Sequence, residues 1–231
     1  MNTNTNTNIN IKTIASMLDV SAVQANSTKK EIQEFAELAI EYDCKAVFVL
    51  PSLLSFLCNY RNERSGKFLI GTPIGFPAGG MTTEMKVLEA KNYLQFDVDE
   101  FDLMINVGFL LSGMYQEVYE DIKAVKNAIG TKTLKVIIEC YYLDHELMKR
   151  AADAVIKGGA DWIKTGTGWT PTGATPENIA YLKQIAGNAV KIKASGGVRN
   201  LETVQKMIEA GAERFGVGKS AKNILAEAEQ L

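Results

Sequence analysis

The stretch Lys157-Gly158-Gly159-Ala160-Asp161-Trp162-Ile163-Lys164 passes from a helix end through a glycine turn into an apolar strand. Residues 41–49, 96–104 and 209–216 have the same order of helix end, turn and strand. The glycines at the ends of two of these helices, Gly158 and Gly211, suit the left-handed backbone conformation that closes a helix. A recurring helix-to-strand unit predicts βα repeats and a parallel sheet.

Candidate strands follow one another along the chain at a spacing that suits one βα unit each. Eight such strands begin near Lys12, Ala46, Phe68, Glu100, Leu134, Trp162, Val190 and Arg214. No linker or composition shift divides the chain, and its 231 residues are enough for one barrel domain. We therefore predict a (β/α)₈ TIM barrel over residues 11–231, in preference to an open doubly wound sheet. In such barrels the chemistry takes place at the carboxyl ends of the strands.

The overall composition excludes several classes of protein. The formal net charge is −2 and charges of both signs are mixed along the chain, so no basic patch predicts binding to nucleic acid or to an anionic membrane. No apolar run is long enough to cross a bilayer. Residues 1–10 form a polar, low-complexity segment that we predict to be disordered and that lacks the features of a signal peptide.

Cysteine and histidine are scarce. Cys44, Cys58 and Cys140 lie far apart and are odd in number, so they form neither a metal-binding spacing nor a disulfide framework. A reducing cytoplasm is the simplest setting for such a chain. The one histidine, His145, follows Asp144 in a typical helix start, and we predict it to lie on the surface of that helix's first turn. A catalytic triad or metal site built on histidine is therefore not expected.

Two predicted strands end with a lysine directly before a glycine-rich loop. Lys164 precedes Gly166-Thr167-Gly168, and Lys193 precedes Ser195-Gly196-Gly197. If both side chains point into the barrel, two ammonium groups meet at its mouth, and burial beside another cation favours the neutral amine. A neutral amine can attack a carbonyl and form an imine. The alternative is that one or both lysines point outward and pair with helix carboxylates.

Carboxylates lie within two other predicted strands. Asp102 stands inside an apolar strand, where an ionised group needs a partner. Lysines across the barrel mouth would supply that partner, and Asp102 could then transfer protons as a general acid and base. Glu139, at the end of the fifth strand, is a weaker candidate. For each residue the alternative is a structural carboxylate that is held by the backbone or by a helix.

Two loops could hold a phosphate group. They follow the predicted seventh and eighth strands, the usual place for phosphate in barrels, and their glycines let backbone N–H groups approach an anion. With the loop after the sixth strand they supply the candidate phosphate contacts Gly168, Gly196, Gly197, Gly216, Gly218 and Lys219. The alternative is that the glycines only form tight turns. An ATP-binding P-loop is excluded, because Glu213 stands where its first glycine is required.

Six motifs, in order along residues 45–225, resemble those of the deoxyribose-phosphate aldolase family. They are Ile74-Gly75-Phe76-Pro77, Thr82-Thr83-Glu84-Met85-Lys86, Glu100-Phe101-Asp102-Leu103-Met104-Ile105-Asn106, Leu134-Lys135-Val136-Ile137-Ile138-Glu139, Ile163-Lys164-Thr165-Gly166-Thr167-Gly168 and Lys193-Ala194-Ser195-Gly196-Gly197-Val198-Arg199. The resemblance implies that Lys164 forms the Schiff base, that Lys193 lowers its pKa and that Asp102 relays protons. It also implies reversible cleavage of 2-deoxy-D-ribose 5-phosphate to glyceraldehyde 3-phosphate and acetaldehyde, without a metal or organic cofactor. Dimers are common in the family, so a homodimer is the expectation.

The chain departs from the family pattern at three places. The family opens its first strand with Ile-Asp-His-Thr-Leu-Leu, whereas the segment Ile14–Asp19 lacks the Asp, His and Thr at the matching positions. Phe48 stands where the second strand commonly has a cysteine, and Leu50 replaces a more polar residue. After the eighth strand Gly218-Lys219 replaces Ser-Ser. These changes leave the lysine chemistry intact and predict an altered pocket.

Three other functions remain open at this stage. The departures favour a Schiff-base aldolase for a different phosphorylated sugar. A non-catalytic phosphosugar-binding barrel would have no use for two buried lysines beside Asp102. A phosphosugar isomerase on the same fold would need a carboxylate base, such as Glu139, and no imine-forming lysine.

Overall fold

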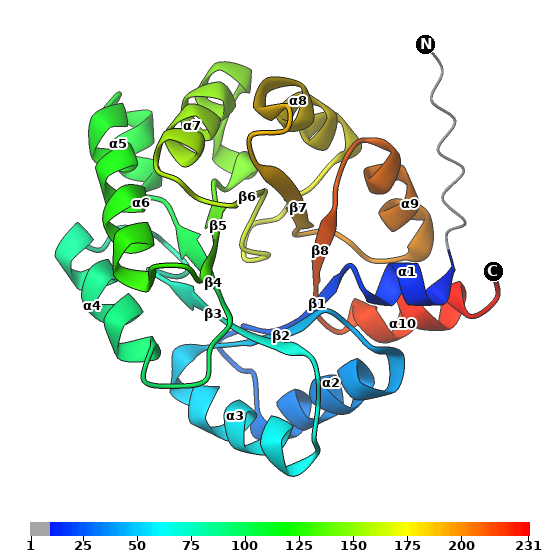
Figure 1. The fold of residues 1–231 in the computed structure, drawn as a ribbon. Coiled ribbons are helices and arrows are strands. Elements are labelled where there is room, and N and C mark those ends of the chain that lie inside the picture. Colours follow the sequence, from blue (N-terminus) through cyan, green and yellow to red (C-terminus); the bar gives the residue numbers. More distant parts are fainter. Residues whose placement is uncertain (1–9) are drawn as a thin grey trace.

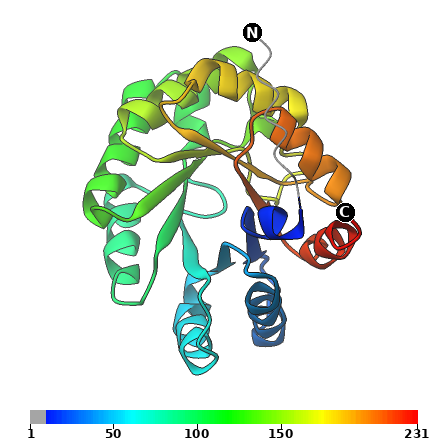
Figure 2. The ribbon, with the colours of Figure 1, turned by 45° about the vertical axis from the view of Figure 1, so that its right-hand side comes forward.

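The computed structural model describes residues 10–231. Over these residues eight parallel strands pair in chain order and close into a barrel, in which β8 pairs with β1. The helices form a ring around the strands (Figure 1), and a view turned by 45° shows the same arrangement (Figure 2). The predicted (β/α)₈ barrel is confirmed.

The strands alternate with helices along the whole described chain. The strands are β1 Leu18–Ala22, β2 Ala46–Val49, β3 Leu69–Ile74, β4 Glu100–Met104, β5 Thr133–Ile137, β6 Trp162–Lys164, β7 Lys191–Ser195 and β8 Arg214–Val217. The helices are α1 Ile11–Ala15, α2 Lys29–Tyr42, α3 Leu54–Glu63, α4 Thr83–Tyr93, α5 Val107–Leu111, α6 Tyr115–Ile129, α7 His145–Lys157, α8 Pro176–Ala186, α9 Leu201–Glu209 and α10 Ser220–Ala228, with short 3₁₀ turns at Pro51–Leu53 and Cys140–Tyr142.

Side chains alternate along each strand between the barrel interior and the surrounding helices. Val136 and Ile163 face the helices and are fully buried in the main apolar core. Their neighbours Lys135 and Lys164 face the barrel interior, where their ammonium groups contact carboxylates of β4. The large apolar core therefore lies between strands and helices, and it leaves the interior free for charged side chains.

The first strand begins later than the sequence predicts. A strand starting near Lys12 is wrong, because residues 11–15 form the short helix α1 and β1 begins at Leu18. The side chain of Asn10 accepts a hydrogen bond from the backbone N–H of Thr13, which caps this helix. Helix α1 packs beside α10 in both views (Figures 1 and 2). The other seven strands begin at the predicted residue or one residue from it.

The glycine turn before β6 also differs in detail. Gly158 is right-handed, with φ −68°, and the left-handed residue is Gly159, with φ 77°. Gly158 is instead required by close packing, because a Cβ there would lie 2.5 Å from Cγ2 of Ile122. Gly211 has φ 108° and is the predicted positive-φ glycine. The two turns are therefore alike in sequence and different in the reason for their glycines.

Two other predictions concern the ends of elements. His145 is exposed in the first turn of α7, and the side chain of Asp144 accepts a hydrogen bond from the N–H of Leu147, as predicted. Residues 1–9 of the predicted polar tail lie outside the described residues, and Asn10 caps α1. Within residues 10–231 no helix has the length and apolarity that crossing a membrane requires.

Candidate active site

Lys164, Lys193 and Asp102 meet inside the barrel, near the carboxyl ends of their strands. Lys164 on β6 and Lys193 on β7 are direct neighbours in the strand register. The Nζ of Lys164 lies 2.7 Å from Oδ2 of Asp102 on β4, and the Nζ of Lys193 lies 3.0 Å from the same oxygen. All three side chains are buried, so the alternative that the lysines point outward to helix carboxylates is wrong.

Burial and charge act in opposite directions on these groups. Burial lowers the pKa of Lys164 to about 8; the neighbouring charge of Asp102 opposes this effect and that of Lys193 adds to it. Burial acts to raise the pKa of Asp102, but Lys164 and Lys193 outweigh it and hold that pKa well below its usual range. Lys193 is raised in pKa, since Asp102 and Asp19 outweigh its burial. The arrangement thus contains a carboxylate, a stable ammonium group and an amine that loses its proton near neutral pH.

Four further charged residues, which sequence reasoning did not assign to the site, lie beneath this group. They are Asp19 on β1, Glu100 on β4, Lys135 on β5 and Arg214 on β8, and all are buried. Lys193 contacts Asp19 at 2.6 Å, and Lys135 contacts Glu100 at 2.6 Å. Strand alternation could have found Glu100, which stands two residues before Asp102 on the same face.

Asp19 was missed because the first strand was placed too early. With β1 at Leu18–Ala22, the family's Ile-Asp-His-Thr falls on Leu18-Asp19-Val20-Ser21. The prediction that this strand has lost its Asp is therefore wrong, since Asp19 occupies that position and contacts both Lys193 and Arg214. Val20 and Ser21 still replace the His and the Thr. Ser21 keeps a hydroxyl at the wall of the cavity above the lysines.

Phe48 fills the barrel beside the lysines, as its size predicts. Its ring centroid lies 4.2 Å from the Nζ of Lys193 and 4.8 Å from the Nζ of Lys135. Both distances suit a cation–π contact. Gly71 on the adjacent strand makes room for the ring, because a Cβ there would lie 2.2 Å from Cζ of Phe48. The second strand thus contributes an apolar wall that also contacts two buried cations.

Glu139 serves the loop after β6. Its carboxylate accepts hydrogen bonds from the backbone and hydroxyl of Thr167 and from the hydroxyl of Thr170. The residue itself is left-handed, with φ 52°. This pattern fits the structural alternative for Glu139, because its oxygens are already used in holding the loop that carries Gly168.

A cavity of about 420 Å³ opens above the lysines. Lys164 lies at its base, and its walls include every residue predicted to contact phosphate: Gly168, Gly196, Gly197, Gly216, Gly218 and Lys219. Gly216 has to be small, since a Cβ there would lie 2.6 Å from Oγ of Ser195. Arg199 and Ser220, from the two predicted phosphate loops, also line the cavity, and so does Ser21, which was not predicted. The candidate imine lysine and the glycine loops therefore share one space.

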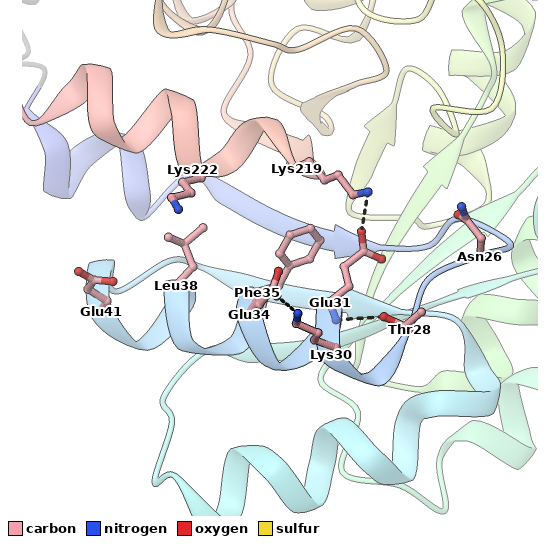
Figure 3. Close-up of a pocket in the computed structure, with 10 residues that line it drawn as sticks. All are labelled: Asn26, Thr28, Lys30, Glu31, Glu34, Phe35, Leu38, Glu41, Lys219 and Lys222. Atoms are coloured by element: carbon pink, nitrogen blue, oxygen red, sulfur yellow. Dashed lines mark hydrogen bonds and ion pairs between the residues drawn. The ribbon is translucent and has the colours of Figure 1, made fainter.

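Lys219 lies at the rim of this cavity. Its side chain is 86% exposed, and its Nζ is 3.8 Å from Oε1 of Glu31 on α2. Figure 3 shows Lys219 reaching from the start of α10 toward Glu31, above a surface groove of about 630 Å³ between α2 and α10. Both residues line the groove and the cavity. Lys219 is thus held loosely, by one carboxylate, within reach of both spaces.

Comparison with known proteins agrees with the barrel fold. The model of the "DeoC/LacD family aldolase" matches residues 13–222. Deoxyribose-phosphate aldolase of Klebsiella pneumoniae is 39% identical over 218 residues, which are 94% of this chain and 88% of the relative. Deoxyribose-phosphate aldolase 2 of Staphylococcus aureus is 41% identical, over 87% of this chain and 91% of the relative. The crystal structure of a putative deoxyribose-phosphate aldolase from Coccidioides immitis superposes with a TM-score of 0.90 at 31% identity, covering 96% and 87% of the two chains.

Proposed function

The chain belongs to the DeoC/LacD family of aldolases, and from this premise we propose that it reversibly cleaves 2-deoxy-D-ribose 5-phosphate to D-glyceraldehyde 3-phosphate and acetaldehyde. Lys164 is the nucleophile. The observation that carries the proposal is the placing of its amine at the base of the cavity, 2.7 Å from Asp102 and beside Lys193. Burying three ionisable groups costs free energy. A protein that only binds a sugar has no chemical use for them that would explain this cost.

The reaction begins at the open-chain aldehyde of the sugar. The neutral amine of Lys164 adds to C1, and loss of water gives an iminium ion. The C3 hydroxyl then gives up its proton and becomes the C3 aldehyde as the C2–C3 bond breaks. The electron pair of that bond forms the C1=C2 double bond of an enamine, and the C=N pair moves onto the nitrogen. Glyceraldehyde 3-phosphate leaves at this stage. Protonation of the enamine at C2 and addition of water release acetaldehyde and restore Lys164.

Asp102 is suited to move these protons. Its Oδ2 is occupied by the two lysines, whereas its Oδ1 accepts no hydrogen bond among the described residues and lies 3.7 Å from Lys135. Asp102 does not itself line the cavity, so this free carboxylate oxygen can act as the general base for the C3 hydroxyl through a bridging water. Lys193 remains protonated and favours the neutral form of Lys164.

The glycine loops and Lys219 are suited to hold the 5-phosphate. Gly196 and Gly197, with φ 85° each, have no side chain to keep an anion away from the backbone of the loop after β7. Gly168 faces them from the loop after β6, and Gly216, Gly218 and Lys219 close the other side of the cavity. Lys219 adds a mobile cation where the family pattern has serine. The phosphate would then lie at one side of the cavity and the aldehyde at its base.

The three cysteines, all buried thiols in the described chain, are compatible with a reducing cytoplasm. A homodimer follows from the family resemblance, and light scattering of the purified protein would test it.

Two alternative functions are less well supported. An isomerase would use Glu139 as its base, but that carboxylate is engaged by Thr167 and Thr170. An aldolase for a different phosphorylated sugar shares every feature of the lysine site. The substitutions at Phe48 and Lys219 are what favour it, since both change side chains at or near the cavity.

Borohydride trapping tests the proposal. The protein is mixed with 2-deoxyribose 5-phosphate or acetaldehyde, reduced, digested and analysed by peptide mass. We expect the two-carbon adduct on Lys164, and loss of trapping and turnover in Lys164→Leu. Lys191→Leu is the matched control, because this lysine lies on the adjacent strand and its side chain is 59% exposed. Turnover without trapping, with full activity in Lys164→Leu, would exclude the imine mechanism. Relative rates on other phosphorylated sugars decide between the two aldolase readings.

A further inference from the structure

Six buried side chains form a closed ring of ion pairs inside the barrel, beneath Lys164. Going round the ring, Asp102 contacts Lys193 at 3.0 Å and Lys193 contacts Asp19 at 2.6 Å. Asp19 contacts Arg214 at 2.7 Å, and Arg214 contacts Glu100 at 2.7 Å. Glu100 contacts Lys135 at 2.6 Å, and Lys135 returns to Asp102 at 3.7 Å. Each member comes from one of five strands, and none is more than 4% exposed.

The ring is electrically neutral by itself. Among the described residues it contains three carboxylates, Asp19, Glu100 and Asp102, and three cations, Lys135, Lys193 and Arg214. Lys164 is the seventh charged group, and within residues 10–231 its one ion-pair partner is Asp102, an oxygen of which it shares with Lys193. A fourth cation would leave a net positive charge in the buried interior, and such a charge is unfavourable.

We propose that Lys135 and Arg214 are positioning residues for the nucleophile: their charges complete the neutral ring, and this makes the ammonium form of Lys164 a surplus cation. The inference rests on the proposed function, since it explains how the imine-forming amine becomes neutral. Neither residue lines the cavity, so neither touches the substrate. Both act on Lys164 through the charges between them.

Lys135 competes with Lys164 for the neutral state, because burial lowers the pKa of both amines. The contacts decide the competition. The Nζ of Lys135 lies 2.6 Å from Glu100 and 3.7 Å from Asp102. The Nζ of Lys164 instead contacts one carboxylate, that of Asp102, which also contacts Lys193. Arg214 stays protonated under all relevant conditions. Lys164 is therefore the amine that gives up its proton.

Other charged groups around Lys164 are engaged elsewhere. After β5, Glu139 accepts hydrogen bonds from the hydroxyls of Thr167 and Thr170. At the cavity rim, Lys219 pairs with Glu31, and Arg199 is exposed to solvent, where charges are well screened. The buried ring of ion pairs therefore provides the charges that act on the amine of Lys164 without screening by solvent.

The test is the pH dependence of imine formation with acetaldehyde, measured as borohydride-trapped adduct on Lys164 after short mixing times. Removing a ring cation by Lys135→Met or Arg214→Gln leaves an unbalanced carboxylate, which favours the ammonium form. The midpoint of the rising limb is then expected to move up by about one pH unit. Removing a ring anion by Asp19→Asn is expected to move it down by a similar amount. Lys191→Met, an exposed lysine on β7, is the control and leaves the midpoint in place.

A balanced double variant separates charge from packing. Asp19→Asn with Lys135→Met restores neutrality, so its midpoint returns toward that of the unchanged protein. A purely structural role would lower the amount of adduct in every variant without moving the midpoints in opposite directions. Asp19→Asn keeps the side-chain shape, so it tests the direction in which the pH midpoint moves even where a variant that lacks a ring cation does not fold.

Two failures are distinguishable. If the unchanged protein gives no adduct on Lys164 at any pH, the proposed function is wrong. If it gives the adduct but the midpoints stay fixed or move in the same direction in all variants, only the role of the ring is wrong.

Discussion

The ring of Phe48 lies directly over Gly71 on the neighbouring strand, where a Cβ would stand 2.2 Å from Cζ and 2.3 Å from Cε1. The aromatic side chain is thus accommodated by the absence of a side chain across the strand pair. Phe48 in turn contacts the ammonium groups of Lys193 and Lys135. The wall of the lysine site therefore depends on this pair of residues.

We expect Gly71→Ala to destabilise the protein by about 1–3 kcal/mol, because the added methyl group displaces the buried ring. The measurement is urea unfolding followed by circular dichroism. Gly80→Ala is the matched control, since no atom lies within 4 Å of its added Cβ. Phe48→Leu combined with Gly71→Ala should recover part of the loss. Equal stability of Gly71→Ala and Gly80→Ala would mean that the position of the Phe48 side chain does not depend on Gly71.

Asp102→Asn should separate the two halves of the reaction. The amide removes the negative charge that favours the ammonium form of Lys164, so borohydride trapping of acetaldehyde at pH 7 is retained or increased. Turnover of the sugar phosphate needs a proton acceptor and should fall by about 10²–10⁴-fold. Loss of trapping together with turnover would instead give Asp102 a role in holding Lys164 in place.

The sequence predicts most of the fold because the order of helix end, turn and apolar strand recurs along the chain at similar intervals. It fails at β1, where a one-turn helix capped by Asn10 precedes the strand and has no periodic pattern of its own. That local error moved the family motif by several residues and hid Asp19. The two buried lysines were predicted because both stand close to a glycine loop: Lys164 ends β6, and Lys193 lies two residues before the end of β7.

The ion-pair ring could not be predicted in the same way. Its contacts join β1, β4, β5, β7 and β8, and which charge faces which depends on the closure and stagger of the barrel. Alternation alone places Glu100 and Arg214 on inner faces. Only the closed geometry brings the guanidinium of Arg214 to 2.7 Å from Glu100.

The contact between Lys219 and Glu31 is expected to affect how tightly the 5-phosphate is bound. Lys219→Met should raise KM for 2-deoxyribose 5-phosphate about two- to fivefold, in proportion to the modest strength of an exposed charge contact, with little change for unphosphorylated 2-deoxyribose. Glu31→Gln frees Lys219 and should lower the same KM. Lys222→Met is the control, because Lys222 lies on the same helix and lines only the outer groove. Equal effects of Lys219→Met on both sugars would place Lys219 outside the phosphate site.

The pH dependence of the unchanged protein follows from the pKa of Lys164. With a pKa of about 8, the neutral amine is scarce at pH 6 and dominant at pH 9, so the rate of imine formation should rise with pH and level off above pH 8. The measurement is the rate of adduct trapping under excess acetaldehyde. A rate that stays flat between pH 6 and pH 9 would mean that Lys164 is already neutral or that another step is measured.

Lys193→Met removes the cation nearest to Lys164 and leaves Asp102 and Asp19 without that partner. Both changes favour the ammonium form of Lys164, so its pKa should rise and the midpoint of imine formation should move to higher pH by about one unit or more. At pH 7 the rate should therefore fall about tenfold or more, and it should recover in large part as the pH is raised toward 10. Recovery is the decisive feature, because a variant that has merely lost the shape of the site stays slow at every pH. Lys193→Arg keeps the charge and should hold the midpoint near its original value, provided that circular dichroism shows the barrel intact. A midpoint that is unchanged in Lys193→Met would mean that burial and the rest of the ring suffice to make Lys164 neutral.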